Sequence, residues 1–295
     1  MRIRDFLLLV VVCLVWALNN VLSKIIVTDW AIPPLFYASL RFALVALVML
    51  PWLLPMPRPA WRIVAIALCL GGGSFSLLFV GLQTVSPSEA AIILQLGVPF
   101  TMLLSVLVLG ERVHWRRALG IVLTLVGVLI VTWRPGGVSL SAGLWFVAAS
   151  AFAGAAGAVL MKQVDGVKPF RFQAWVGLVS TSVLTLATVL LEHGQWKAAT
   201  SIGWPLVAAV LFTALVVSVC AHSIYYYLID RYEANLLAPL TLMTPLGTIG
   251  LGVLITNDHF DMRMAVGGSL AMLGVLIVAL RRKPATQLLV EREIR

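Results

Sequence analysis

Long apolar stretches constrain this 295-residue chain more than any other feature of its sequence. Hydrophobic residues make up 61% of the chain and charged residues only 11%, against about 45–50% and about 25% in soluble domains. The stretches run close to 20 residues, about the length of helix that crosses a hydrocarbon core of about 30 Å. Alternating segments of about 10 residues, which are typical of membrane β-barrels, do not occur. The sequence therefore predicts an all-α integral membrane protein.

Clusters of proline and glycine divide the apolar sequence into ten expected transmembrane helices. The first is interpreted as a membrane helix and not as a cleaved signal peptide, because Asn19 and Asn20 interrupt the run and its apolar character continues to Val27. The helices are expected at residues 6–27, 35–54, 61–82, 88–109, 117–133, 142–161, 171–191, 204–229, 234–255 and 264–280.

The distribution of basic residues predicts the orientation of these helices. Of the 21 Lys and Arg residues, 16 lie at the termini and in the loops on their side, 3 lie in the other loops, and Lys24 and Arg41 lie within helices. Since cytoplasmic loops are rich in Lys and Arg, we expect a multi-pass protein of the bacterial inner (plasma) membrane with both termini in the cytoplasm. The net charge of +9 then reflects topology and contact with membrane lipids, not nucleic-acid binding.

A repeated sequence divides the chain into two halves. The five residues 127–131, Gly-Val-Leu-Ile-Val, recur at 274–278, and Gly120 recurs as Gly267 at the same 147-residue offset. This predicts one unit at residues 1–135 (helices 1–5), a second at 136–283 (helices 6–10) and a cytoplasmic tail at 284–295. Because each unit has an odd number of helices, the second must enter the membrane from the opposite side. Such inverted repeats support transport by alternating access.

Several motifs resemble a known transporter family. They are Trp16–Asn20 with Lys24, Pro33–Tyr37 with Leu40–Phe42, Pro99 with Leu109–Arg112, and Arg231–Glu233 with Ala238–Leu240 and Pro245. Together they are similar to EamA-type exporters of the drug/metabolite transporter superfamily, and to the branch that exports cysteine and O-acetylserine. The resemblance implies ten helices in two EamA units and export of small metabolites or amino-acid-like compounds. The second unit departs from the first, with Thr256–Asp258 in place of Leu109–Glu111, so substrate contacts are expected to be asymmetric.

One face of the first helix is a candidate substrate surface. Trp16, Asn20 and Lys24 are spaced four residues apart and share that face, with Asn19 beside it. Trp offers a flat apolar wall, and Asn offers donors and acceptors. The structural alternative is that the asparagines tie helices together while Lys24 extends to the membrane interface.

Arg41 is a candidate contact for an anionic group. It lies about 12 Å along the second helix from Pro33 at the usual rise per residue, with Tyr37 one turn away on the same face. A guanidinium binds a carboxylate through two parallel hydrogen bonds, which would suit a carboxylate substrate. The structural alternatives are an ion pair, for which Glu89 is the available acid, or bonding to backbone carbonyls.

Prolines interrupt the fourth and ninth helices, the corresponding helices of the two halves. Interrupted helices at matching positions indicate the binding site of a transporter. The residues concerned are Pro99 with Gln95 one turn earlier, and Pro239 and Pro245 with Thr241, Thr244 and Thr248. The threonines either contact substrate or compensate for hydrogen bonds that the prolines remove.

The eighth helix carries a polar stripe of Ser218, His222 and Tyr226, again spaced four residues apart. A histidine can change its charge near neutral pH and so relay protons. The alternative is a histidine that is simply hydrogen-bonded within the core.

These observations favour a secondary transporter that exports small metabolites, with helices 5 and 10 as scaffold. No Walker motif is present, so neither ATP nor another cofactor is expected. The three cysteines lack metal-ligand spacing. The expected partners are a small-molecule substrate, membrane lipids and either a proton or no coupling ion; the oligomeric state stays open. A flippase for lipid-linked or amphipathic substrates is the main alternative, and a membrane-embedded enzyme is another.

Overall fold

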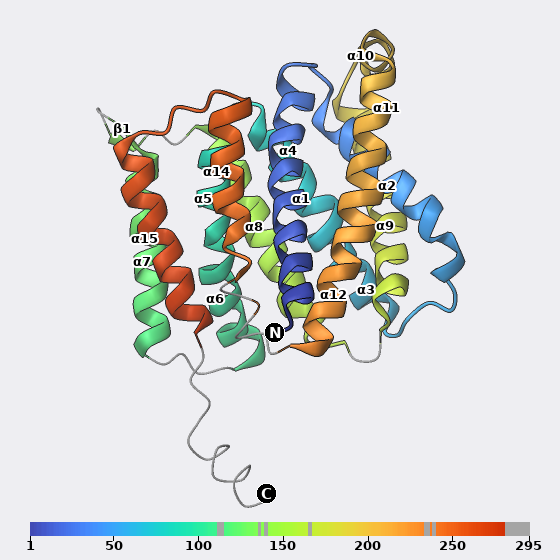
Figure 1. Ribbon diagram of the computed structural model, residues 1–295. Helices are drawn as coiled ribbons and strands as arrows, with labels where there is room; N and C mark the ends of the chain where they lie inside the picture. Colours follow the sequence, from blue (N-terminus) through green and yellow to red (C-terminus); the bar gives the residue numbers. More distant parts are fainter. Residues whose placement is uncertain are drawn as a thin grey trace, which may run out of the picture.

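The computed structural model describes residues 1–110, 115–134, 137–138, 141–164, 167–232, 237 and 240–280. Most of the long helices run side by side in one bundle (Figure 1). The strands of the described part are β1 (Trp133–Arg134) and β2 (Gly137–Val138), which form a short antiparallel pair. We call the end where α1 begins and α12 ends the proximal end, and the end that carries α10 the distal end (Figure 1).

The first half contains seven α-helices and three short segments of different helical pitch. They are α1 (Ile3–Thr28), α2 (Pro34–Met49), the 3₁₀ turn η1 (Leu50–Trp52), α3 (Ala60–Ala67), the π-helical η2 (Leu68–Gly73), α4 (Ser74–Leu82), α5 (Pro87–Ile93), the 3₁₀ turn η3 (Leu94–Leu96), α6 (Gly97–Leu109) and α7 (Trp115–Thr132). The segment η2 joins α3 to α4, and η3 joins α5 to α6. The third and fourth predicted helices are therefore each continuous, with a change of helical pitch along their length.

The second half is built from similar helical elements. Its elements are α8 (Ala142–Met161), α9 (Pro169–Leu191), α10 (Gln195–Ile202), α11 (Trp204–Leu211), the π-helical η4 (Phe212–Ala221), α12 (His222–Arg231), α14 (Met243–Ile255) and α15 (Met262–Ala279). The described residues hold nine helical stretches long and apolar enough to cross a membrane, and α14 is a shorter apolar helix. The ninth predicted helix is thus seen only as α14, since residues 233–236 and 238–239 lie outside the described part.

The outer surface of the bundle is apolar, as a lipid environment requires. Leu254, Leu107 and Met262 are 79%, 71% and 76% exposed. In water such surfaces would drive aggregation, whereas in a bilayer they meet lipid chains. Together with the apolar spans, this exposure identifies a multi-pass membrane protein.

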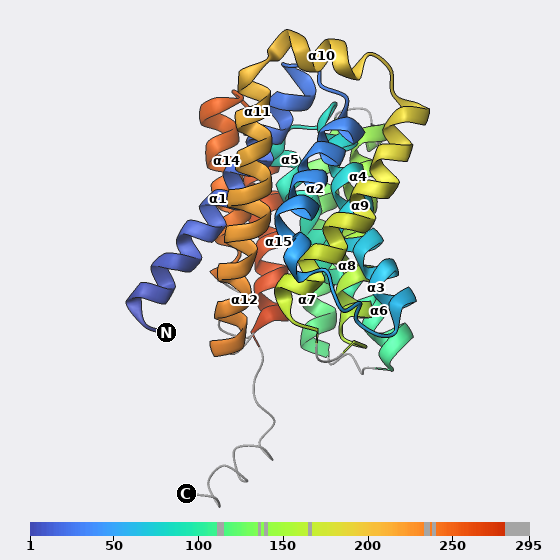
Figure 2. The same cartoon turned by 90° about the vertical axis from the view of Figure 1, so that its right-hand side faces the viewer.

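The short helix α10 was not expected from the sequence. It joins α9 to α11 and lies across the distal end of the bundle (Figure 2). Its Trp196 ring packs edge-on against Phe36 of α2, with the ring centroids 5.5 Å apart. An eight-residue segment is too short to give the long apolar run that predicts a membrane helix.

The repeated glycines explain the contact between α7 and α15, which lie side by side in Figure 1. A Cβ atom on Gly120 would lie 2.6 Å from the carbonyl oxygen of Gly274, and one on Gly127 would lie 2.5 Å from that of Gly267. Only glycine permits backbones to approach so closely. Gly120 therefore pairs with Gly274 and Gly127 with Gly267, so the two helices run antiparallel.

Two π-helical segments occupy corresponding places in the two halves. Shifted by the 147-residue offset of the sequence repeat, η2 falls at residues 215–220, within η4. In η4 the carbonyl oxygen of Thr213 accepts from Ser218 Oγ at 3.0 Å, and that of Val217 lies 2.8 Å from Nδ1 of His222. Segments of π-helix inside α-helices frequently mark functional positions.

At the distal end, two carboxylates that each follow the end of one helix cap the start of a different helix. Glu192 follows α9 and accepts from the backbone N–H groups of Leu35 and Phe36, at 2.8 and 2.9 Å. Asp258 follows α14 and accepts from the backbone N–H of Ser88 at 3.0 Å. The first N–H groups of a helix have no partner within it and attract negative charge. These carboxylates therefore fix the starts of α2 and α5.

Candidate functional site

A buried polar cluster joins α1, α2 and η4, and Arg41 of α2 lies at its centre. The Arg41 side chain is fully buried. Its Nε donates to Ser218 Oγ at 3.0 Å, and its Nη1 donates to Asn19 Oδ1 at 3.1 Å. The three helices thus meet at one guanidinium, and the predicted site residues Asn19 and Arg41 are in direct contact.

Neither structural alternative for Arg41 is found. Its hydrogen bonds within the described part of the chain go to neutral side chains, and no carboxylate there forms an ion pair with it. Glu89 instead takes part in the capping box with Ser86 at the start of α5. The guanidinium packs on the ring of Phe75 of α4, with Cζ 4.4 Å from the centroid. Arg41 is therefore a buried cation with polar and aromatic neighbours.

Trp16 and His222 bring the first and eighth predicted helices together beside this cluster. Their ring centroids lie 5.4 Å apart, and Trp16 also meets the edge of Tyr225 at 5.1 Å. Trp16 is one turn before Asn19, and His222 is one turn after Ser218, so both adjoin the partners of Arg41. The structure thus brings the Trp16 face together with the polar stripe that runs from η4 into α12. The side chain of Tyr226, also predicted for this site, lies outside the described residues.

The other residues on the Trp16 face bind different neighbours. Asn20 Nδ2 donates to Thr248 Oγ1 at 3.2 Å, and Thr248 Oγ1 donates to the Thr244 carbonyl oxygen at 3.0 Å. Asn20 therefore links α1 to the predicted threonine face of α14. Lys24 Nζ donates to the carbonyl oxygen of Leu82 at 2.7 Å, a contact that favours the C-terminal end of α4. Lys24 does not simply extend into the membrane interface.

Tyr37 lies one turn before Arg41 and is fully buried. Its hydroxyl group is 3.4 Å from Ser23 Oγ, and its ring packs on Phe79 with centroids 4.8 Å apart. Tyr37 thus supports the contact between α1 and α2 on the distal side of the cluster. Ser23 was not recognised in the sequence, because a serine within an apolar helix gives little indication of its partner.

The interrupted helices appear where the prolines predict them. Gln95 lies in the 3₁₀ turn η3, and Pro99 is buried in the first turn of α6. Pro245 lies in the first turn of α14, after a turn in which Thr244 N–H donates to the Thr241 carbonyl oxygen at 2.9 Å. In the described part of the chain, no hydrogen bond or ring contact joins Gln95 or Pro99 to the Arg41 cluster. Pro239, like Glu111, Arg112, Glu233 and Ala238 of the sequence motifs, lies outside the described residues.

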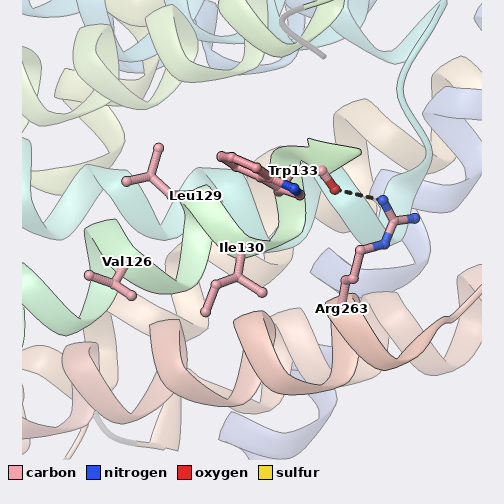
Figure 3. Close-up of a pocket in the computed structure, with 5 residues that line it drawn as sticks. All are labelled: Val126, Leu129, Ile130, Trp133 and Arg263. Atoms are coloured by element: carbon pink, nitrogen blue, oxygen red, sulfur yellow. Dashed lines mark hydrogen bonds between the residues drawn. The ribbon is translucent and has the colours of Figure 1, made fainter. Parts of the chain in front are cut away.

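A surface groove of about 280 Å³ lies elsewhere, along α7 and α15 (Figure 3). Its lining comprises Val126, Leu129, Ile130, Trp133 and Arg263. Arg263 donates to the Trp133 carbonyl oxygen at 2.6 Å and forms an ion pair with Asp261. The Met264 backbone N–H and then the Arg263 side chain hold the pKa of Asp261 below its ordinary value. The charges at this groove are therefore balanced, and its apolar lining suits contact with lipid.

Comparisons with known proteins agree with the membrane fold. The EamA-like transporter family matches this chain twice, at residues 4–133 and 140–280. A "Probable amino-acid metabolite efflux pump" of Salmonella typhimurium is 29% identical, over 93% of this chain and 94% of the relative. A protein of the same name from Escherichia coli is 26% identical over the same shares. A solved structure covers 100% of both chains with a TM-score of 0.62 and 19% identity, a likeness that shows the fold alone. Because the two family matches span nearly the whole sequence, the chain belongs to the EamA-like transporter family.

Proposed function

We propose that this chain is a secondary transporter that exports small metabolites, with amino acids or related compounds as its substrates. The observation that carries the proposal is the polar cluster around Arg41, buried between membrane helices. Ionisable groups within membrane helices are costly, and they commonly mark substrate or ion pathways. The names of the two efflux-pump relatives support amino-acid metabolites as the substrate class.

Alternating access between two inverted repeats is the proposed mechanism. The repeats are residues 1–135 and 136–283, with a tail at 284–295. In the α7–α15 contact, Gly120 meets Gly274, which is the repeat counterpart of Gly127. Gly127 likewise meets Gly267, the counterpart of Gly120. Contacts between two-fold related copies are reciprocal in this way. A two-fold axis that relates antiparallel helices is perpendicular to them, and so lies in the membrane plane. The matching positions of η2 and η4 support the same relation.

The proposed orientation places the proximal end in the cytoplasm of a bacterial cell, at its inner (plasma) membrane. The excess of basic residues at the termini and in the loops on their side supports this orientation. Substrate would then enter from the proximal end and leave at the distal end, where Glu192 and Asp258 cap α2 and α5.

The proposed substrate contacts extend from the Arg41 cluster along the interrupted helices. They are Trp16, Asn19, Asn20, Tyr37, Arg41, His222, Tyr226 and Thr244, with Gln95, Pro99 and Thr241 at the helix interruptions. The direct contacts of Asn19 with Arg41, Trp16 with His222, and Asn20 with Thr248 support one continuous surface. Rocking of the two halves would expose this surface to each side of the membrane in turn.

Metabolite profiling of the growth medium tests the proposal. Cells that overproduce the chain should release amino acids, cysteine or O-acetylserine faster than cells that carry the empty vector. Trp16→Ala and Asn20→Ala should each reduce this release at normal expression. Trp145→Ala is the matched control, because Trp145 of α8 is 61% exposed on the surface of the bundle. Unchanged release across a broad metabolite panel would refute the exporter, and full release by both variants would refute the site.

Coupling has two forms that fit this site: proton exchange through His222, or downhill efflux without a coupling ion. Nδ1 of His222 faces the Val217 carbonyl oxygen, which can only accept a hydrogen bond, so Nδ1 carries a proton in either form. His222→Gln separates the two forms. A flattened pH dependence of export supports the proton relay, and an unchanged profile supports uncoupled efflux.

A further inference from the structure

Two buried donors at the Arg41 cluster have no acceptor among the described residues. Arg41 uses Nε and Nη1 for hydrogen bonds, but its buried Nη2 has no partner among the described residues. The indole Nε1 of Trp16 is likewise buried without an acceptor in that part of the chain. Buried polar atoms are nearly always satisfied, so each exception requires an explanation.

The unsatisfied donors lie in a region of uncompensated positive charge. The described residues supply Arg41 with the hydroxyl of Ser218, the amide oxygen of Asn19 and the ring of Phe75, all of them neutral. A buried charge without a counter-charge is strongly unfavourable. Within the described part of the chain, the cluster therefore presents a buried positive charge that a negatively charged group could neutralise.

The two donors share the same surroundings. Trp16 is one turn from Asn19, the acceptor of Arg41 Nη1, and its ring contacts His222, one turn from Ser218. Both open groups are donors only, because neither guanidinium nor indole N–H can accept a hydrogen bond. A carboxylate is an acceptor with two oxygens and several lone pairs. A carboxylate thus has the two acceptor oxygens that the two donors require, and the negative charge that neutralises the guanidinium.

We propose that Arg41 Nη2 and Trp16 Nε1 bind the carboxylate of the exported metabolite. This rests on the proposed function and specifies the chemistry of that site. The site takes compounds with a free carboxylate, such as zwitterionic amino acids, and discriminates against their amides, esters and organic cations. A monoanion fits better than a phosphate dianion, since the site offers a single formal positive charge and one neutral N–H.

Binding to the purified full-length chain in lipid nanodiscs tests the proposal. The probes are L-alanine, L-serine, L-leucine and L-phenylalanine, each measured by calorimetry beside its carboxamide. At least one acid should bind about tenfold or more tightly than its amide, the scale of a charge-assisted hydrogen bond. The proposal is overturned if acids and amides bind equally, or if no acid of the panel binds.

Substitutions assign the preference to the two donors. Arg41→Gln should bring the ratio of acid to amide affinity close to one, while Arg263→Gln, which alters the charge-balanced surface groove, should leave it unchanged. Trp16→Phe keeps an aromatic ring beside His222 but removes the N–H, and should weaken acid binding several-fold and amide binding less, because a bond to a charged acceptor is the stronger one. If Arg41→Gln does not fold, Arg41→Lys and Trp16→Phe decide. An acid-to-amide affinity ratio that is unchanged in both of these variants would refute the assignment.

Failure of this inference is distinguishable from failure of the proposed function. If cells release neutral or cationic compounds and Arg41→Gln does not change that release, the exporter stands and the carboxylate site is refuted. If acids bind in an Arg41-dependent way but overproduction releases no metabolite, the binding site stands and the exporter is refuted.

Discussion

The partners of Arg41 are those expected of the proposed binding site and not of a structural ion pair. A structural arginine in a membrane helix is expected to meet a carboxylate or backbone carbonyl oxygens, yet the side chains of Asn19 and Ser218 hold this guanidinium with neutral oxygens. The two bonds fix the plane of the guanidinium while leaving its charge available. The residue at position 19 thus determines whether the charge of Arg41 is neutralised within the chain, since asparagine and aspartate have nearly the same shape and differ in charge.

We expect Asn19→Asp to abolish carboxylate binding without unfolding the protein. The new carboxylate would lie where Asn19 Oδ1 now accepts from Arg41, at about the same 3.1 Å, and would form the missing ion pair. A substrate carboxylate would then meet a neutralised site, and its affinity should fall at least about tenfold. Calorimetry with the amino-acid panel measures the affinity, and thermal unfolding monitors the fold.

Asn19→Ser is the control for that substitution, because serine keeps a neutral acceptor on α1. It should retain the preference for acids over amides, with some loss of affinity from the shorter side chain. If Asn19→Asp binds amino acids as tightly as the original chain does, the positive charge of Arg41 is not what attracts the substrate.

At the scale of elements, helix ends and helix interruptions position this site. The π-helical η4 brings Ser218 to Arg41 and places His222 beside Trp16. The start of α2, eight residues before Arg41, is fixed from outside by Glu192. Thr188 adds a hydrogen bond to the same carboxylate at 2.7 Å, so the end of α9 and the start of α2 form one unit.

Glu192→Ala should therefore destabilise the protein by about 1–2 kcal/mol, the usual effect of losing a helix cap together with its hydrogen bonds. The N–H groups of Leu35 and Phe36 would lose their acceptors, and the first turn of α2 would fray. Denaturation in mixed micelles measures the free energy of unfolding, and hydrogen exchange at Leu35 and Phe36 reports the local effect.

Asp29→Ala serves as the matched control, since Asp29 is an exposed carboxylate at the same distal end. Its removal should change the free energy of unfolding by less than about 0.5 kcal/mol. Equal losses in the two variants would show that the effect of Glu192 comes from the general charge of this end and not from the cap.

For the whole molecule, the sequence predicts the membrane spans from the length of its apolar runs, and the two halves from its repeated glycines. Nine of the ten expected spans coincide with helices of the described chain to within a few residues. The repeated Gly120 and Gly127 divide the chain into two halves in the sequence, but their packing against α15 is known only from the structure. Asn20 and Lys24 illustrate the limit: they share a helical face with Trp16, yet each binds a different neighbour. Periodicity gives the face of a helix but not the element that covers it.

The π-helical segments and Phe75 could not be predicted for a related reason. An apolar run such as residues 68–73 or 212–221 has the same composition in an α-helix and in a π-helix, so nothing in the sequence marks the change of pitch. Phe75 has no polar group to suggest that it would lie against Arg41. Tertiary packing determines both features.

The reciprocal glycine contact leads to a prediction about the two halves together. Gly127 and Gly274 are counterparts in the repeat, and a Cβ atom on either would press against the backbone of the opposite helix, near the carbonyl oxygens of Gly267 and Gly120. Gly127→Ala and Gly274→Ala should each lower the free energy of unfolding by about 1–3 kcal/mol, by similar amounts in the two variants. Gly250→Ala is the control, because a Cβ there meets nothing within 4 Å. It should be neutral or stabilising, since alanine favours a helix over glycine. A loss of unfolding free energy in the paired glycine variants and a gain in the control would show that close packing, and not helix propensity, causes the loss.

A large loss in only one of Gly127→Ala and Gly274→Ala would argue against a symmetric contact. It would therefore argue against the two-fold relation on which the proposed inverted repeat depends.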